Sequence, residues 1–396
     1  MDGVLAVLRL PGVRSLFAFS CIGRLPMGAL GLLMILVTHD RTDSFASGGL
    51  VAASYTIALG FSNPALARWV DRAGQTIVLR TGAVVSAAAM ATFALLPESA
   101  GVGVLTACAA VAGAAQPPVG ACMRSLWAVL TSDADVRHAA YSLEGAAGEI
   151  IYILGPVAIV GGIGAWSLHA ALLACALAVL VGDLLFSLHP VSRGWRPPEH
   201  AERHLLGALR GPGVCVLIAA FALCGLAVGA VEVAVPATLE PLGREKLTGL
   251  LLGLWGVGSL LTALLVARAG AASDPPRRLA VLLAAWGAAH AAIALATGPV
   301  SLGVLLLLAG ASISPVMVYA NGMLDHLAPA GTLAEAFTWT TTGLTAGIAS
   351  GAALAGALVE SASPSTACAV LGGGGILAAL IVRATARGAL RPAVAV

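Results

Sequence analysis

The sequence predicts an all-α protein that crosses a membrane with twelve helices, arranged as two pseudo-symmetric bundles of six. Three observations lead to this fold class. Of the 396 residues, 59% are hydrophobic and only 10% are charged, whereas soluble domains carry about 25% charged residues. The apolar residues form twelve runs, each close to the roughly 20 residues that a transmembrane helix needs. One sizeable polar stretch, 189–211, separates six of these runs from the other six.

The predicted spans follow one another with short polar turns between them. The first six lie at 14–37, 47–67, 76–96, 101–123, 139–163 and 167–188. The last six lie at 212–237, 247–267, 279–297, 301–323, 336–359 and 365–384. We therefore expect an N-terminal bundle over 1–188, a cytoplasmic linker over 189–211 and a C-terminal bundle over 212–396.

Basic residues predict how the spans are oriented, because Lys and Arg collect on the cytoplasmic side of membrane proteins. With the N-terminus in the cytoplasm, only Arg41, Arg244 and Lys246 of the 21 basic residues lie outside, and Arg24 lies within the first span. Both chain ends are then cytoplasmic, in a multi-pass protein of the cytoplasmic membrane. We expect a monomer surrounded by the lipid bilayer.

Composition argues against several other classes. Residues 1–14 contain no apolar core followed by a small-residue cleavage site, so no signal peptide is expected. The seven cysteines form no CxxC pair, which argues against a disulfide framework and a metal site. The net charge of +2 is too small to indicate a nucleic-acid partner. No cofactor is expected.

The turn between the second and third spans gathers charge, glycine and an aromatic side chain at a membrane edge. It reads Ala67-Arg68-Trp69-Val70-Asp71-Arg72-Ala73-Gly74-Gln75-Thr76. Part of it, Val70–Gly74, is similar to Val266–Gly270, which follows the eighth span. A recurrence at the equivalent turn indicates two parallel six-helix repeats.

The twelve spans, the central linker and this turn together resemble the major facilitator superfamily. The loop signature of that family reads roughly G-x-L-a-D-R-x-G-R-K, and Asp71, Arg72 and Gly74 match its strongest positions. The sequence departs from the signature at Ala67, Trp69 and the pair Gln75-Thr76. The resemblance covers the whole chain in topology and implies a transporter that works by alternating access.

The resemblance also implies a cytoplasmic gate formed by Asp71, Arg72, Gly74 and Arg80. Asp71 would lie against the start of the eleventh span, near residues 335–338, where a carboxylate meets the positive N-terminal end of a helix. The alternative is that the arginines of this turn serve only to set the topology.

The fifth span carries a second family feature. Its Gly155-Pro156 and Gly161-Gly162 pairs are similar to a glycine-rich signature of many drug–proton antiporters, although the spacing differs. Proline inside a helix removes a backbone hydrogen bond, so Gly155 and Pro156 are expected to form a hinge. The segments leading to Glu144 and from Glu335 to Trp339 also resemble a group of actinobacterial members regarded as exporters.

Ionisable residues inside the hydrocarbon region are costly, so each one is a candidate functional residue. Helical rise places Arg24, Glu144 and Glu149 at similar depth in the N-terminal bundle. We favour Glu149 as the partner of Arg24, with Tyr152 beside it, in a pair that exchanges a proton or is broken by a charged substrate. A static ion pair that holds two spans in register is the alternative.

Two further carboxylates lie toward the ends of spans. Asp183 is expected near the cytoplasmic end of the sixth span, in contact with water. Glu232 is expected near the outer face, as an outer gate or a solvated helix end. The polar and aromatic residues suited to a cavity wall are Tyr319 and Asn321 in the tenth span and Trp339 in the eleventh.

These features predict a secondary active transporter. No glycine-rich phosphate loop is present, so an ion gradient, most simply of protons, would supply the energy. We expect export of a small drug-like or amphipathic molecule in exchange for protons, which makes the protein an efflux antiporter. The alternative is proton-coupled uptake of a metabolite or sugar. A polytopic enzyme or a sensor is more remote, because neither HExxH nor GxSxG occurs.

Overall fold

The computed structural model describes residues 7–131, 134–196, 207–266, 274–329 and 332–390. Within these ranges every assigned element is a helix. The described residues contain eleven helices long and apolar enough to cross a membrane, and the number is twelve if the bent pair Val13–Gly28 and Leu30–Thr42 forms one span. The predicted all-α, twelve-span architecture is therefore confirmed, with the first span broken in the middle.

The first half of the chain forms spans one to six. Its elements are α2 (Val13–Arg24), η1 (Leu25–Gly28), α3 (Leu30–Thr42), α4 (Phe45–Ala73), α5 (Gln75–Leu95), α6 (Val102–Ala114), α7 (Val119–Leu130), α8 (Ala134–Leu154), η2 (Gly155–Gly164) and α9 (Leu168–Leu188). A short helix, α10 (Pro190–Gly194), follows.

The second half forms spans seven to twelve after the short helix η3 (Ala208–Arg210). Its elements are α11 (Pro212–Leu239), η4 (Glu240–Leu242), η5 (Glu245–Leu247), α12 (Thr248–Val266), α13 (Pro275–Ala292), η6 (Ile293–Leu295), α14 (Pro299–Gly310), α15 (Ile313–Leu327), α16 (Leu333–Ser361), α17 (Pro364–Gly372) and α18 (Gly374–Thr385). The predicted domain boundaries at 188 and 212 coincide with helix ends, and the division into two domains stays a prediction.

Breaks within spans occur at proline and glycine, which weaken or interrupt the helical hydrogen-bond ladder. In the first span, Pro26 and Gly28 lie in η1, and the two flanking helices meet at 42°. In the fifth span, the backbone changes to a π-helix at Gly155-Pro156. Short π-helical segments interrupt helices frequently at functional sites, so the predicted hinge coincides with a real irregularity.

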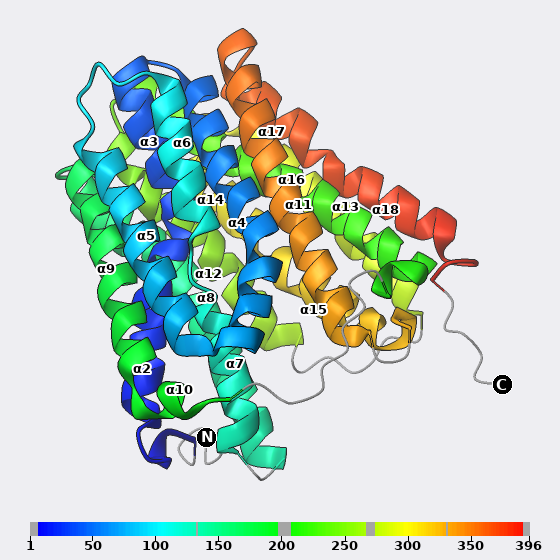
Figure 1. The fold of residues 1–396 in the computed structure, drawn as a ribbon. Helices are drawn as coiled ribbons and strands as arrows, with labels where there is room; N and C mark the ends of the chain where they lie inside the picture. Colours follow the sequence, from blue (N-terminus) through cyan, green and yellow to red (C-terminus); the bar gives the residue numbers. More distant parts are fainter. Residues whose placement is uncertain (1–6, 132–133, 197–206, 267–273, 330–331, 391–396) are drawn as a thin grey trace.

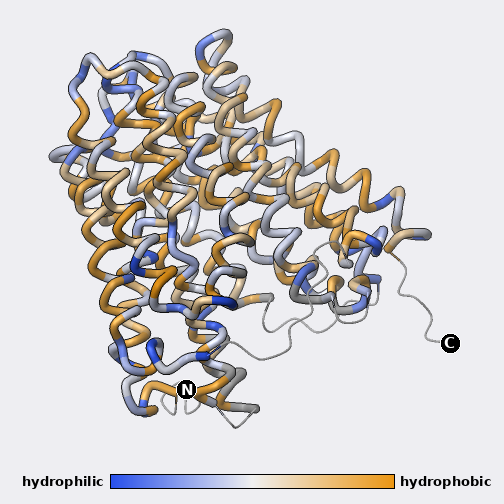
Figure 2. Tube along the Cα trace, in the orientation of Figure 1, coloured by the Kyte–Doolittle hydropathy of each residue, from blue (hydrophilic) through white to orange (hydrophobic). Residues whose placement is uncertain are grey.

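The helices run between two ends of the molecule, which we name by the chain segments found there (Figure 1). The linker side contains the start of α2, the helix α10 and the start of α11. The opposite side contains the α3–α4, α11–α12 and α16–α17 connections. Hydrophobic residues cover most of the helices between these ends (Figure 2). The predicted recurrence Val266–Gly270 lies almost entirely outside the described residues.

Buried apolar residues form three clusters. A shared core lies toward the opposite side and joins both halves, with Leu33 and Phe93 from the first half and Val233 and Leu306 from the second. Toward the linker side the two halves have separate clusters. The first-half core contains Leu16, Leu79 and Trp127, and the second-half core contains Leu217, Trp286 and Leu324. Among the described residues, the apolar cluster that contains both halves thus lies toward the opposite side.

Candidate functional site

The contact between the halves on the opposite side brings helix backbones close together. A side chain at Gly49 of α4 would collide with the carbonyl oxygen of Ala352 in α16. In the same way, Gly249 of α12 leaves room for the backbone of Gly161 in η2. Small residues at such crossings allow close helix packing. We call this contact region the closed end.

Polar contacts between the halves lie at the outer margin of the closed end. His39 Nε2, at the end of α3, is 2.9 Å from Glu240 Oε1, just beyond α11. Ser44 Oγ donates to Glu360 Oε1 over 2.5 Å, and the backbone N–H of Ala46 donates to the same oxygen over 3.0 Å. Sequence reasoning missed these pairs, because nothing in the sequence relates residues about 200 or 300 positions apart.

Glu232 lies in the membrane at the boundary between the halves. It is partly buried on α11, and its carboxylate faces Gly31 of α3, where an added side chain would lie 3.3 Å from Oε2. It forms no hydrogen bond or ion pair with the described residues. Eight residues separate it from Glu240, so it lies about 12 Å deeper than the margin of the closed end. The contact with the other half is what an outer gate would require, and both predicted roles, an outer gate and a solvated helix end, stay predictions.

A buried ion pair lies inside the first half. Arg24 Nη1 is 2.6 Å from Glu144 Oε1, and the two residues are only 9% and 6% exposed. Trp127 Nε1–H donates to Glu144 Oε2 over 3.3 Å, and Arg24 Nε donates to the carbonyl oxygen of Ser20 over 3.1 Å. The pair therefore connects α2, α7 and α8.

Asp183 belongs to the same region, and the expectation that it contacts water is wrong. It is 1% exposed on α9, because α2 and α9 approach each other closely at Gly23 and Gly182. Its carboxylate lies against Gly23 and interacts electrostatically with Arg24. Neither of its oxygens accepts a hydrogen bond from a described residue. The guanidinium of Arg24 thus faces the carboxylates of Glu144 and Asp183. The net charge of these three groups is zero when one of the two carboxylates is protonated.

The partner found for Arg24 is Glu144, whereas the sequence favoured Glu149. The side chain of Glu149 lies outside the described part of the structure. The two glutamates are about 140° apart around a helix, so the rotation of α8, set by tertiary packing, decides which one meets Arg24. Tyr152 is exposed, and its backbone packs against Gly28 in the break of the first span.

The predicted gate turn is only partly described. The side chain of Asp71 lies outside the described residues, so its contact with the eleventh span stays a prediction. Gly74 ends α4 with a φ of 85°, a conformation that favours glycine. Arg72 is exposed, and Arg80 Nε donates to Ser187 Oγ over 3.4 Å. The Arg80 contact joins α5 to α9 within the first half.

The candidate cavity residues of the second half, Tyr319, Asn321 and Trp339, differ in what they contact. The guanidinium of Arg278 on α13 lies 5.8 Å from the ring centre of Tyr319, so Tyr319 contacts a neighbouring helix of its own half. Asn321 is partly exposed. Trp339 Nε1–H donates to Glu335 Oε1 over 3.3 Å, and Glu335 Oε2 accepts from the N–H of Ala208 over 3.1 Å. Trp339 is therefore part of the contact that holds η3 to α16.

A docking site for the start of the linker was also missed. Gln75, which departs from the family signature, is 1% exposed. Its Nε2 donates to Ser125 Oγ over 3.0 Å, and its Oε1 accepts from Ser192 Oγ over 3.0 Å. His189 Nε2 lies 3.2 Å from Ser15 Oγ, and its Nδ1 accepts from Val191 N–H over 3.4 Å. Residues 189–195 are thereby held to the first half.

We expect this docking to weaken as the pH falls. Burial lowers the pKa of His189 below its ordinary value. The docked state then binds fewer protons than the undocked state, so docking is complete above the ordinary histidine pKa of about 6.5 and is lost progressively below it. Hydrogen-exchange protection of residues 189–195 should fall between pH 7.5 and pH 5.5. His189→Gln should abolish the pH dependence and His326→Gln should leave it unchanged; equal pH dependence in both variants would contradict the assignment.

The long apolar helices among the described residues make this chain a multi-pass membrane protein. Over residues 16–245 its sequence matches the family described as Major Facilitator Superfamily. The chain belongs to this family, and it is a transporter, not an enzyme.

Solved structures of transporters share the fold. The nucleoside transporter NupG superposes with a TM-score of 0.74 at 14% identity, covering 93% of this chain and 99% of that one. The peptide transporter POT in complex with sulfate gives a TM-score of 0.73 at 14% identity, with 96% of each chain covered. No curated protein matches the sequence.

Proposed function

We propose that this protein moves a small organic molecule across the cytoplasmic membrane by alternating access, coupled to protons. The observation that carries the proposal is Glu232, a carboxylate inside the membrane that faces the other half and has no partner among the described residues. A carboxylate in this environment can hold a proton or meet a cationic group of a substrate. Its place at the boundary between the halves makes its surroundings sensitive to their movement.

The distribution of arginines supports a cytoplasmic linker side. With that orientation the closed end faces outward, and the halves separate toward the cytoplasm. A substrate would then reach Glu232 from the cytoplasm in this state. Opening of the closed end would expose the same carboxylate to the outside. Proton coupling requires a group that is accessible from each side of the membrane in turn.

Export is the proposed direction. It is supported by the similarity of the Gly155-Pro156 and Gly161-Gly162 pairs in the fifth span to the glycine-rich signature of drug–proton antiporters. In this span the backbone becomes a π-helix that packs against Gly249 of α12 at the closed end. A flexible segment at this contact is suited to a movement that opens the closed end. The proposed substrate is drug-like or amphipathic, as the same similarity to drug–proton antiporters implies.

We expect Glu232→Gln to abolish substrate accumulation driven by a pH gradient while leaving substrate exchange intact. Glutamine keeps the size of the side chain but cannot release a proton. A substrate is first selected by thermal-shift screening, and transport is then measured in proteoliposomes. Accumulation in vesicles with an acidic lumen indicates proton antiport, and accumulation in vesicles with an alkaline lumen indicates proton symport, irrespective of how the protein is inserted.

Two further variants complete this test. Glu245→Gln serves as the matched control, because Glu245 is exposed on η5 and its carboxylate forms no hydrogen bond or ion pair with a described residue, and it should retain gradient-driven transport. Glu149→Gln tests the site that the sequence favoured. Full gradient-driven accumulation in Glu232→Gln would remove Glu232 as the coupling residue.

A further inference from the structure

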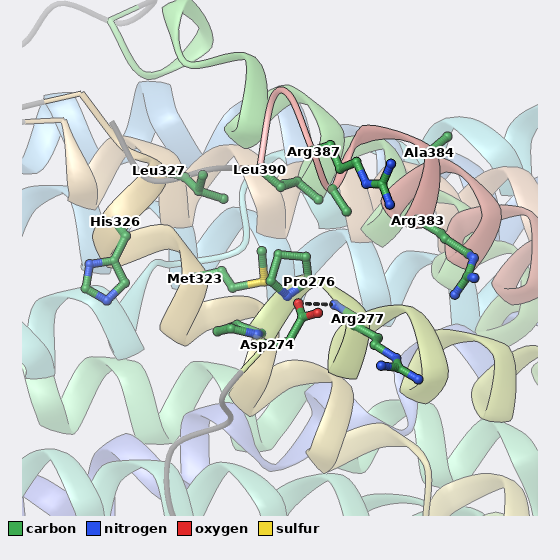
Figure 3. A pocket seen from close by; sticks show the side chains of 12 residues that line it. Asp274, Pro276, Arg277, Met323, His326, Leu327, Arg383, Ala384, Arg387 and Leu390 are labelled. Atoms are coloured by element: carbon green, nitrogen blue, oxygen red, sulfur yellow. Dashed lines mark hydrogen bonds between the residues drawn. The ribbon is translucent and has the colours of Figure 1, made fainter. Parts of the chain in front are cut away.

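A pocket of about 980 Å³ opens on the linker side of the second half. It lies between the start of α13, the end of α15 and the end of α18 with the turn that follows it (Figure 3). All of its lining residues come from 274–277, 323–327 and 383–390. The pocket is therefore separate from the boundary between the halves, where the proposed transport site lies.

Three arginines border this pocket. Arg277 comes from the first turn of α13, Arg383 from the last turn of α18, and Arg387 from the turn beyond it. In Figure 3 their side chains lie along one side of the pocket, and His326 lies on the other. None of the three guanidinium groups forms a hydrogen bond or an ion pair with a described residue.

The pocket contains one carboxylate, which is already engaged. Asp274 Oδ1 accepts a hydrogen bond from the backbone N–H of Arg277 over 3.1 Å and caps the start of α13. The two residues between them, Pro275 and Pro276, have no N–H to offer. The start of this helix thus supplies no free backbone donor, and the arginine side chains are the donors available to an anion.

The rest of the lining is apolar. Met323 and Leu390 are buried at 5% and 2% exposure, and Pro276 and Leu327 lie beside them. A planar guanidinium presents paired donors that match the oxygens of a phosphate. Arginines around an apolar floor therefore suit a ligand in which a phosphate group is joined to a less polar body.

We propose that this pocket binds the phosphate group of an anionic ligand. Its position at the ends of three membrane spans, on the side predicted to be cytoplasmic, is the depth at which phospholipid headgroups lie. The same chemistry would accept a soluble phosphate ester arriving from the cytoplasm. Binding would connect α13, α15 and α18, because each of them contributes residues to the lining of the pocket.

The test uses the purified full-length protein in detergent and measures its thermal stability. One arm adds phosphatidylglycerol, with phosphatidylcholine as the zwitterionic comparison. A second arm adds inorganic phosphate or glycerol phosphate. Phosphatidylglycerol should raise the melting temperature saturably, and phosphatidylcholine should not. Stabilisation by glycerol phosphate alone, at comparable concentration, would assign the pocket to soluble phosphate esters.

Variants of the lining arginines test whether phosphatidylglycerol stabilises the protein by binding in this pocket. Arg383→Gln with Arg387→Gln should weaken the apparent affinity for phosphatidylglycerol roughly 25-fold, at roughly fivefold for each arginine near the membrane surface. Lysine at both positions keeps the charge but loses the paired donors, so it should weaken binding less. Arg193→Gln removes an exposed arginine from the linker side of the first half and should bind as the unaltered protein does.

An equal loss in Arg193→Gln and in the double glutamine variant would overturn the proposal. So would the absence of saturable stabilisation by any phosphate compound. In either case the three arginines would serve only to orient the spans. Size-exclusion profiles without added ligand verify that each variant is folded before the comparison is made.

Discussion

Arg24→Met is expected to destabilise the protein by roughly 3–5 kcal/mol, the range for breaking a buried ion pair from one side. The change leaves Glu144, which is 6% exposed, without the guanidinium that lies 2.6 Å away. Asp183 loses the same neighbour. The measurement is the fraction of monodisperse protein that remains after heating, followed by fluorescence-detected size exclusion.

A double variant separates structure from transport. Arg24→Met with Glu144→Met replaces both charges by apolar side chains, and such exchanges are often neutral or stabilising. It should recover the part of the lost stability that comes from Glu144, whereas Asp183 stays buried without the guanidinium. If the pair also takes part in proton movement, gradient-driven transport stays absent in the recovered protein. Normal stability of the single variant Arg24→Met would show that the contact contributes little, and normal transport in the double variant would make the pair purely structural.

Gly49→Leu is expected to prevent the closed end from forming. A side chain at this position collides with the carbonyl oxygen of Ala352, and neither backbone can move without disturbing the packing of α4 on α16. A cost of about 3 kcal/mol would lower the population of the closed state roughly 100-fold. Because alternating access requires this state, transport should fall to a similar extent.

The control is Gly60→Ala on the same helix. There an added methyl group would lie 3.4 Å from Thr345 Cγ2, an ordinary contact, so closure should be retained. Spin labels at Asp40→Cys and Leu242→Cys, both exposed on the opposite side, report the separation of the halves. The distance should increase in Gly49→Leu and stay unchanged in Gly60→Ala; equal distances in both would contradict this role for Gly49.

The spans could be predicted because each is a long apolar run, and hydropathy is a local property of the sequence. The break in the first span also has a local signal, since Pro26 and Gly28 lie within four residues. The gate turn was recognised from its charges, and Gly74 has the left-handed backbone that favours glycine at the end of α4.

The partners of the buried charges could not be predicted. Helical rise gives the depth of Glu144 and Glu149, but the rotation of α8 depends on its packing against α2 and α7. The burial of Asp183 likewise depends on the close contact of Gly23 with Gly182, which joins residues far apart in the chain. The contacts of His39 with Glu240 and of Gln75 with Ser192 also join residues far apart in the chain, so they too depend on tertiary packing.

The shared core has a consequence for how substitutions act. Apolar residues in the first-half core and the second-half core are packed within one half, so shortening them removes buried surface without favouring either arrangement of the halves. Residues of the shared core such as Phe93 and Val233 belong to a cluster that includes both halves, and part of that packing is lost whenever the closed end opens. Shortening these side chains therefore changes two quantities together: the free energy of unfolding and the resting distribution between inward-open and outward-open molecules.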